Sequence, residues 1–273
     1  MRKLYPGFSF AAMTVLMACS SDSGTEVNSE LPPNFSKPSP ESANEYDPSS
    51  SSVVSDGPFA QNASVATGTL VDERDGRTYK TVKIGDQVWM AENLNYKVEN
   101  SFCYEEEDSN CAKYGQLYLW SVAMDSAGIF EGNSANGCGF GTECYASRGI
   151  VRGVCPAGWH LPSKGEFETL FKVVGGKDVA GTKLASASGW NDFNNHSLNG
   201  TDDYSFSALP GGYWYIKEDY SDAGFLNGGY VAAFWSSTEQ NNGVVYGVYL
   251  IGDYVILHDW YKHNGLSVRC IRD

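Results

Sequence analysis

The alternation of apolar and polar residues predicts two β-hairpins at the start of a globular region. In residues 71–79 (VDERDGRTY), the pair Asp75-Gly76 stands between two short strand-like stretches, and Asp-Gly is a preferred two-residue hairpin turn. Residues 80–90 repeat this arrangement around Gly85-Asp86. The globular part is therefore expected to open with an antiparallel sheet.

A different periodicity marks the clearest helix. Ser163 can cap a helix N-terminus, and Glu166 follows three residues later, which is the spacing of a capping box. One apolar face occupies the i, i+3, i+4 and i+7 positions, formed by Phe167, Leu170, Phe171 and Val174. Gly175-Gly176 is expected to end this helix, and a shorter helix is expected at residues 178–185.

The remaining segments are less regular. Residues 118–124 are apolar and are expected to begin a helix, although the pattern alone hardly separates helix from strand. Beyond residue 189 the chain is rich in Gly, Asn and aromatic residues, which indicates long loops with short strands at 234–237, 247–250 and 266–270. The predicted fold class is α+β, with few helices, short antiparallel strands and long loops.

The N-terminus has the pattern of an export signal. Arg2 and Lys3 precede a mostly apolar stretch that ends in Leu16-Met17-Ala18-Cys19, and such a stretch ending in small residues is typical of a secretory signal. A cysteine directly after the expected cut, with leucine three residues before it, is the bacterial lipoprotein form. Residues 1–18 are therefore predicted to be a lipoprotein signal peptide, with lipid such as palmitate on Cys19. The alternative is an ordinary signal peptide with an incidental cysteine.

The residue after the cysteine bears on the destination of the protein. Serine at this position, here Ser20, usually permits export to the outer membrane of a Gram-negative cell. The expected localisation is the bacterial outer membrane, with the protein lipid-anchored and surface-exposed. Contact with the membrane would be made through the anchor.

Composition changes near residue 68. Residues 20–67 hold 13 Ser and 6 of the chain's 10 Pro, and such a stretch buries too little apolar surface to offset its ordering entropy. Residues 19–67 are therefore predicted to be the lipidated cysteine and a disordered linker. Residues 68–273 contain all seven Trp and are long enough for one domain with a buried core.

The net charge of the chain is −14. Arg2 and Lys3 would leave with the signal peptide, which makes residues 19–273 more acidic still, at −16. This charge argues against nucleic acid as a partner, because nucleic-acid binding requires a cationic surface. It leaves room for divalent cations.

Seven cysteines are present. With Cys19 assigned to lipid, an even number remains, which in an exported protein indicates disulfides. Several pairings are open; Cys103–Cys111 and Cys138–Cys144 are favoured because each would close a short polar loop, which leaves Cys155–Cys270. Metal binding by these cysteines is the weaker alternative, because no CxxC motif occurs.

Several strings in the globular part resemble one family. They are GDQVWMAENLNY (85–96), YGQLYLWSVAM (114–124), CPAGWHLPSKGEFETL (155–170), FSALPGGYW (206–214), AFWSSTE (233–239) and LSVRCIRD (266–273). In this order they resemble the Fibrobacter succinogenes major paralogous domain (FISUMP) over residues 68–273. The resemblance implies a secreted or lipid-anchored protein with no settled biochemical role.

The same region is more distantly similar to the C-type-lectin-like fold shared with formylglycine-generating enzymes. Leu161-Pro162-Ser163 and residues 267–270 fall at corresponding places. This resemblance implies a C-type-lectin-like domain behind the disordered linker. The reactive cysteine pair of those enzymes has no counterpart, because no cysteine lies between Cys155 and Cys270.

Aromatic residues in or beside Gly-rich segments are the candidate ligand-binding residues. A planar ring can stack on the apolar face of a sugar while neighbouring Asn and Asp side chains bind its hydroxyl groups. The candidates are Tyr213, Trp214, Tyr215, Tyr220, Tyr230, Trp260 and Tyr261. The alternative is that most of them belong to the core.

An oxygen-rich stretch is the candidate calcium site, because Ca²⁺ binds oxygen ligands. Its residues are Asn191, Asp192, Asn195, Asp202 and Asp203. Their spacing is not that of an EF-hand, and Asn and Asp are also ordinary loop formers.

The expected function is non-catalytic binding at the cell surface, of polysaccharide or another surface polymer. The sequence has no Gly-x-Ser-x-Gly elbow, HExxH motif or phosphate loop, so no catalytic residue is assigned, and no cofactor apart from calcium. Two alternatives stay open. One is an enzyme that is related to formylglycine-generating proteins or acts on carbohydrate, and the other is a structural or display protein that binds surface proteins.

Overall fold

The structure, a computed structural model, describes residues 65–130, 135, 137–144, 149–217 and 221–273. All of them belong to one compact unit, Phe59–Asp273. The predicted signal peptide, Cys19 and the linker up to residue 64 lie outside the described residues, as does Tyr220. No helix in the described part of the chain is both long and apolar enough to span a membrane.

The first sheet is antiparallel and has the strand order β1-β2-β3-β15-β6. Its strands are β1 (Ala66–Asp72), β2 (Arg77–Ile84), β3 (Gln87–Met90), β15 (Ile271–Arg272) and β6 (Trp159–His160). The two predicted hairpins are confirmed as β1–β2 and β2–β3. Gly76 and Gly85 have positive φ angles of 73° and 61° at their turns, a conformation that glycine adopts at no steric cost.

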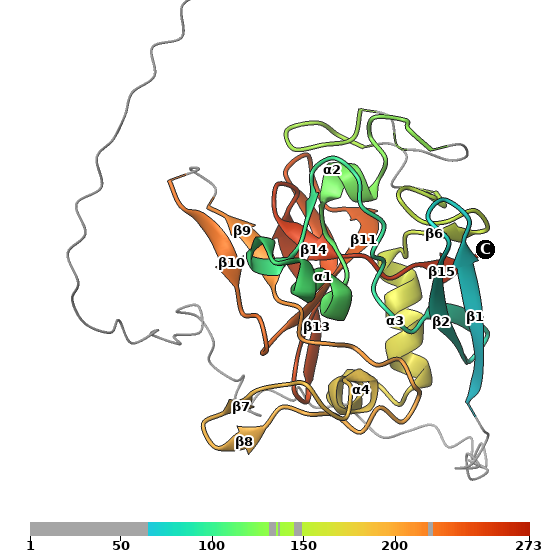
Figure 1. Cartoon of the computed structure of the whole chain (residues 1–273), viewed down its shortest axis with the longest axis vertical. Helices are drawn as coiled ribbons and strands as arrows, with labels where there is room; N and C mark the ends of the chain where they lie inside the picture. Colours follow the sequence, from blue (N-terminus) through green and yellow to red (C-terminus); the bar gives the residue numbers. More distant parts are fainter. Residues whose placement is uncertain (1–64, 131–134, 136, 145–148, 218–220) are drawn as a thin grey trace, which may run out of the picture. The chain divides into compact units, whose positions relative to one another are not determined.

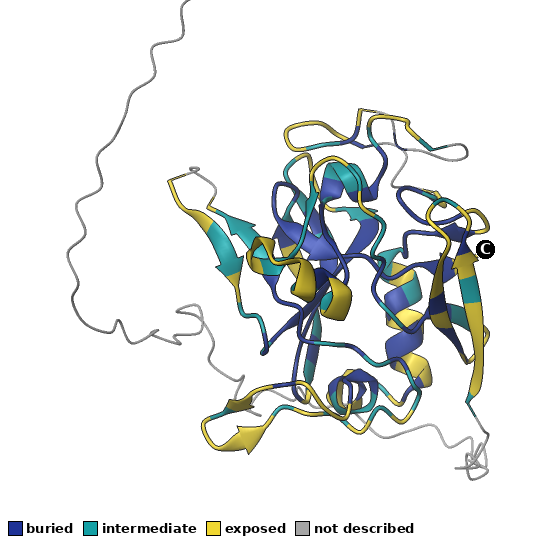
Figure 2. Cartoon of the chain, in the orientation of Figure 1, coloured by how far each residue is buried: buried dark blue, intermediate teal, exposed yellow. Residues whose placement is uncertain are grey.

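The second sheet has the order β10-β9-β14-β11-β12-β13, and β5 pairs with both β14 and β4. Its strands are β4 (Ser101–Phe102), β5 (Leu117–Leu119), β9 (Tyr213–Ile216), β10 (Ala223–Leu226), β11 (Ala232–Glu239), β12 (Val244–Ile251), β13 (Tyr254–Tyr261) and β14 (Gly265–Ser267). A separate exposed hairpin consists of β7 (Asp192–Phe193) and β8 (His196–Ser197). Figure 2 shows this hairpin and much of β1 exposed, with β14 and β11 buried at the centre.

Helices fill the space between and beside the sheets. They are α1 (Asp108–Tyr114), which follows the 3₁₀ turn η1 (Tyr104–Glu106), and α2 (Trp120–Ala123), α3 (Lys164–Val173) and α4 (Lys177–Leu184). α3 lies between the β1–β2–β15 side and the strands around β11 (Figure 1). The core cluster unites Trp89 of the first sheet, Phe167 of α3 and Phe234 of the second sheet. The fold is α+β, as predicted.

The capping box predicts the start of α3 correctly. The Ser163 side chain accepts a hydrogen bond from the Glu166 amide, and the Glu166 carboxylate accepts one from the Ser163 amide. The predicted helix at 178–185 is confirmed as α4. Residues 118–124 are divided between the end of β5 and α2, so the helical prediction is only half right.

The C-terminal segment 265–272 belongs to both sheets. It begins as β14 in the second sheet and ends as β15 in the first. The predicted strand 266–270 is therefore shorter than expected and stops at Ser267. Beyond it, the carbonyls of Val268 and Cys270 accept hydrogen bonds from Leu94 and Met90 (2.8 and 3.0 Å), because the chain is crossing from one sheet to the other.

Three disulfides confirm the favoured pairing: Cys103–Cys111, Cys138–Cys144 and Cys155–Cys270. The last joins residues 115 positions apart, and closing so long a loop removes the most entropy from the unfolded chain. It ties the segment 265–272 to the connection between α2 and β6, which contains Cys155.

A buried lysine anchors the loop closed by Cys138–Cys144. The Lys262 ammonium group donates to the carbonyls of Gly139 (3.1 Å) and Thr142 (2.8 Å) and to the Glu239 carboxylate. Its side chain is fully buried, so these hydrogen bonds replace the water that a charged group would otherwise require.

His160 joins α3 to the C-terminus through two carboxylates. Its Nε2 lies 2.8 Å from Glu166 Oε1, and its Nδ1 lies 2.7 Å from Asp273 Oδ1. Both contacts are hydrogen bonds to ionised carboxylates only when the imidazole is doubly protonated. Burial alone would lower the pKa of His160, but the two hydrogen-bonded carboxylates outweigh it and raise the pKa.

This bridge predicts a specific pH dependence of stability. A raised pKa stabilises the fold at pH values below the ordinary 6.5 of histidine, and the contribution is lost as pH rises through the folded value. The free energy of unfolding of the wild type should therefore fall more steeply above pH 6.5 than that of His160→Gln, as measured by urea denaturation across this range. The other histidines are unchanged in the variant and serve as the internal control. Equal slopes for the two proteins would contradict the bridge.

Candidate functional site

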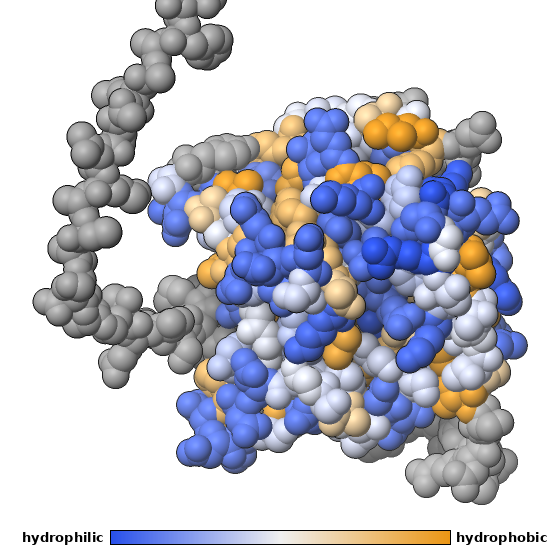
Figure 3. Space-filling model, viewed as in Figure 1, coloured by the Kyte–Doolittle hydropathy of each residue, from blue (hydrophilic) through white to orange (hydrophobic). Residues whose placement is uncertain are grey.

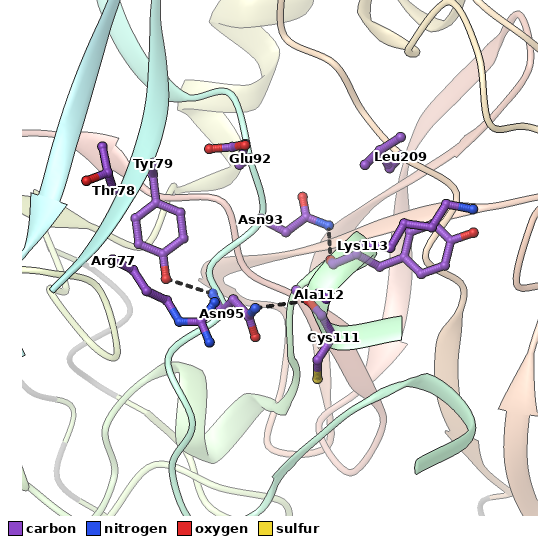
Figure 4. A pocket seen from close by; sticks show the side chains of 12 residues that line it. Arg77, Thr78, Tyr79, Glu92, Asn93, Asn95, Cys111, Ala112, Lys113 and Leu209 are labelled. Atoms are coloured by element: carbon purple, nitrogen blue, oxygen red, sulfur yellow. Dashed lines mark hydrogen bonds between the residues drawn. The ribbon is translucent and has the colours of Figure 1, made fainter. Parts of the chain in front are cut away.

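An open polar cleft lies between β2, the segment 92–97 and α1. It has two adjoining parts, of about 200 Å³ and about 460 Å³, which share Arg77, Asn95, Cys111 and Ala112 in their walls. Figure 4 shows the first part, with Asn93 and Asn95 between Tyr79 of β2 and the residues of α1. On the face drawn in Figure 3, hydrophilic residues predominate and hydrophobic ones form small groups.

The 92–97 segment forms the floor of the cleft, and a buried arginine holds it in place. Arg269 donates from Nε (3.1 Å) and from a terminal nitrogen (2.7 Å) to Asn93 Oδ1, and it also donates to the carbonyls of Phe206 and Ser207. Its guanidinium carbon lies 4.4 Å from the ring centroid of Phe206 and 5.1 Å from that of Phe234. Burial lowers the pKa of Arg269 to about 9, which leaves it charged at neutral pH.

Asn93, which is held by Arg269, also binds the end of α1. Its amide Nδ2 donates to the Tyr114 carbonyl (2.8 Å) and to Ser267 Oγ (3.2 Å). One side chain thus connects the crossing segment to the end of α1, and its polar atoms are used for structure.

Tyrosine hydroxyls hold the rest of the floor, which has no regular secondary structure. Tyr79 accepts a hydrogen bond from the Asn95 amide (3.1 Å), and Tyr118 donates to the Tyr96 carbonyl (2.8 Å). Burial raises the pKa of Tyr79 to about 12 and also raises that of Tyr118. Both hydroxyls therefore stay protonated at physiological pH.

α1 forms the opposite wall and is held against the floor at its middle and at its C-terminal end. Asn95 Nδ2 donates to the carbonyl of Cys111 (2.9 Å), which is also tied by the disulfide to Cys103. At the end of α1, Gly115 has a φ angle of 78°, and a Cβ there would lie 2.8 Å from the Leu94 carbonyl oxygen. Glycine is required at this position because both the angle and the close approach exclude a side chain.

The second part of the cleft carries balanced charge. Asp75 and Asp108 supply two acidic groups, and Arg77 and Lys97 supply two basic groups. Asp75 forms an ion pair with Arg77 at 3.2 Å. This balance favours a neutral ligand over a strongly charged one.

The predicted aromatic residues lie elsewhere. Tyr213 and Trp260 pack against each other with ring centroids 4.8 Å apart, and they are only 6% and 4% exposed. Burial raises the pKa of Tyr213 to about 12. These two rings belong to the packing of the second sheet, so the alternative weighed for them from the sequence holds.

The other candidates are partly buried. Trp214 points to the opposite side of its strand from Tyr213 and contacts Phe102 and Phe225, at centroid distances of 5.6 and 4.7 Å. Partly buried as well are Tyr215, Tyr230 and Tyr261. Of the six candidates in the described part of the chain, none lines either part of the cleft.

The predicted calcium ligands have local roles. Asn195 has a φ angle of 63° at the turn between β7 and β8, and Asp202 accepts hydrogen bonds from the amide and hydroxyl of Ser207 (2.7 and 2.6 Å). The remaining three are exposed: Asn191, Asp192 and Asp203. Among the described residues, no group of three or more His, Cys, Asp or Glu side chains could hold a metal ion, and calcium binding stays a prediction.

The cleft residues Asn93, Asn95 and Gln116 were missed by the sequence analysis. They occur within the strings 85–96 and 114–124 that carry the family resemblance, which was the available signal. Amide side chains give no pattern by themselves, because the same residue type serves backbone carbonyls at one position and faces a cavity at another.

The network under the cleft predicts the effect of a conservative substitution. In Arg269→Lys, a single ammonium group replaces a planar fork and cannot reach the Asn93 oxygen and both carbonyls together. The free energy of unfolding should fall by about 2–4 kcal/mol because buried acceptors lose their donors. Chemical denaturation measures this loss, and Arg272→Lys is the control because Arg272 is exposed. A loss no larger than that of the control would show that the fork is not required.

The chain also matches a known family. The profile of the Fibrobacter succinogenes major domain (Fib_succ_major) covers residues 82–272. This range includes α1, the 92–97 segment and all the strings noted in the sequence except Asp273, whereas the cleft residues of β2 and its preceding turn lie just before it. No curated protein and no solved structure matches the chain. Because the family match spans well over half of the 273 residues, this chain belongs to the Fibrobacter succinogenes major domain family.

Proposed function

We propose that this chain is a lipid-anchored protein of the bacterial outer membrane whose domain binds polysaccharide without catalysis, in the cleft beside α1. The observation that carries the proposal is the lining of this cleft. Amide and tyrosine side chains line it together with side chains of both charges. Groups of this kind bind hydroxyls through directed hydrogen bonds.

Two of the acidic groups of the cleft, Asp75 and Glu92, support binding rather than catalysis. Asp75 accepts a hydrogen bond from the Arg77 amide (3.0 Å) and pairs with its side chain. Glu92 Oε2 accepts a hydrogen bond from the Lys80 amide at 2.7 Å. A carboxylate engaged in this way serves its own loop, whereas a general acid or base must reach the reacting proton.

The domain architecture is compatible with the lectin-like resemblance. An antiparallel sheet and a mostly antiparallel one, in which only β11 and β14 pair in parallel among the described strands, are connected by long loops. These loops are held by disulfides and side-chain hydrogen bonds. We include a C-type-lectin-like fold in the proposal on this basis. Function does not follow from the fold, so the binding claim depends on the cleft itself.

The anchor is tested by labelling. Cells that express the full chain with a metabolic palmitate label should yield a labelled protein in the membrane fraction. Cys19→Ser should abolish the label and release the protein, since the thiol is the acceptor of the lipid. Ser20→Ala is the control because it leaves the thiol in place. Equal labelling of wild type and Cys19→Ser would refute the anchor.

The binding site is tested by blocking it. Ala112 lies exposed on α1 in both parts of the cleft, so Ala112→Tyr should fill the space without disturbing the core. Depletion of the purified full chain by microcrystalline cellulose or insoluble xylan should then weaken roughly tenfold, equivalent to about 1.4 kcal/mol. Thr169→Tyr, at an exposed position of α3, is the matched control and should bind as the wild type does.

Two results would count against polysaccharide binding in the cleft. The first is that the wild-type chain is not retained by either polysaccharide. The second is that Ala112→Tyr is retained as well as Thr169→Tyr, which would place the contact elsewhere on the domain.

A further inference from the structure

One buried side chain in the cleft is left without a structural task. Gln116 follows Gly115 directly and lies between α1 and β5, where its backbone amide donates to the Leu94 carbonyl at 3.0 Å. The residue is only 4% exposed, and it lines the larger part of the cleft. Its side-chain oxygen Oε1 is buried and has no hydrogen-bond partner in the part of the chain that the structure describes.

The unpaired oxygen of Gln116 contrasts with the neighbouring amide side chains, which form hydrogen bonds within the fold. Asn93 uses both polar atoms of its side chain within the fold, and Asn95 donates to the carbonyl of Cys111. Gln87 is also satisfied, since its Nε2 donates to the Glu166 carbonyl and its Oε1 accepts from the Trp89 indole. A buried acceptor without a donor destabilises a fold, so Gln116 is unusual among the amides of this domain.

The chemistry of a primary amide defines what could satisfy Gln116. Its terminal torsion is soft and roughly two-fold, so a half turn exchanges the positions of Oε1 and Nε2. In either orientation the amide has one acceptor and one donor side by side. Two neighbouring hydroxyl groups complement this pair, because one hydroxyl donates to Oε1 while the other accepts from Nε2.

The charges around Gln116 further restrict the chemical class of the ligand. The same part of the cleft contains Asp75 and Asp108 together with Arg77 and Lys97. A polyanion would meet the two carboxylates and a polycation would meet the two basic groups, so neither gains a net attraction. A neutral ligand rich in hydroxyl groups has no such conflict.

We propose that Gln116 is the specificity-determining residue of the cleft and that it binds two adjacent hydroxyl groups of a neutral sugar residue. This inference rests on the proposed binding function and adds the ligand class and the residue that recognises it. The sugar binds in the larger part of the cleft and supplies the missing partner of the buried amide.

The test uses two glutamine variants of the full chain with opposite expectations. Gln116→Leu removes an unsatisfied buried group, so the melting temperature should stay the same or rise while the affinity for cellohexaose or xylohexaose falls roughly tenfold or more. Gln87→Leu breaks two structural hydrogen bonds, so its melting temperature should fall while its affinity is kept. Titration calorimetry gives the affinities and thermal denaturation gives the stabilities.

The outcomes distinguish the role of Gln116 from the binding of sugar in the cleft as a whole. Loss of binding in Gln116→Leu at undiminished stability supports the inference. Binding that is lost in Ala112→Tyr but retained in Gln116→Leu overturns the role of Gln116 and leaves the cleft as the binding site. A wild-type chain that binds neither neutral oligosaccharide, or binds only an acidic one such as oligogalacturonate, overturns the neutral-sugar assignment. A lower melting temperature for Gln116→Leu would also overturn it, because the amide would then be structural.

Discussion

The short C-terminal segment that crosses between the two sheets is the constraint on which the structure depends. Residues 265–267 pair with strands of one sheet and residues 271–272 with strands of the other. Between them, Arg269 is buried and Cys270 is joined to Cys155. A buried guanidinium group is costly unless every donor finds an acceptor, and here the acceptors come from Asn93, Phe206 and Ser207. The position of these three segments is thereby fixed relative to the crossing.

Buried side chains stabilise several loops of this domain. Lys262 holds the loop of residues 138–144 by donating to its carbonyls, as Arg269 holds the loops around residues 93 and 206. Two disulfides close short loops of the same kind. Long connections carry many backbone groups that no ladder satisfies, and buried cations and amide side chains supply the missing partners.

The shape of the cleft results from these side-chain contacts. Asn93, fixed by Arg269, meets the end of α1, and the close approach at Gly115 brings α1 against the 92–97 segment. α1 is therefore fixed against the 92–97 segment by direct contacts, although that segment has no regular secondary structure. Such a preorganised polar site loses little entropy on binding, which suits recognition of a flexible, hydroxyl-rich polymer. Gln116 differs from its neighbours because it is held in place by its backbone while its side-chain oxygen remains unsatisfied.

The sequence by itself determined the local features of this protein. Asp75-Gly76 and Gly85-Asp86 defined the hairpins, the Ser163–Glu166 pair defined the start of α3, and short spacing defined two disulfides, because each depends on residues close together in the chain. Only the tertiary structure decided which face of a strand is covered, so it alone could place Tyr213 and Trp260 in the core rather than at a binding surface. It also decided that Asn93 and Arg269 meet across 176 positions and that Gln116 lines a cleft. Periodicity reports nearest neighbours along the chain, whereas these contacts arise from the packing of segments that the sequence keeps far apart.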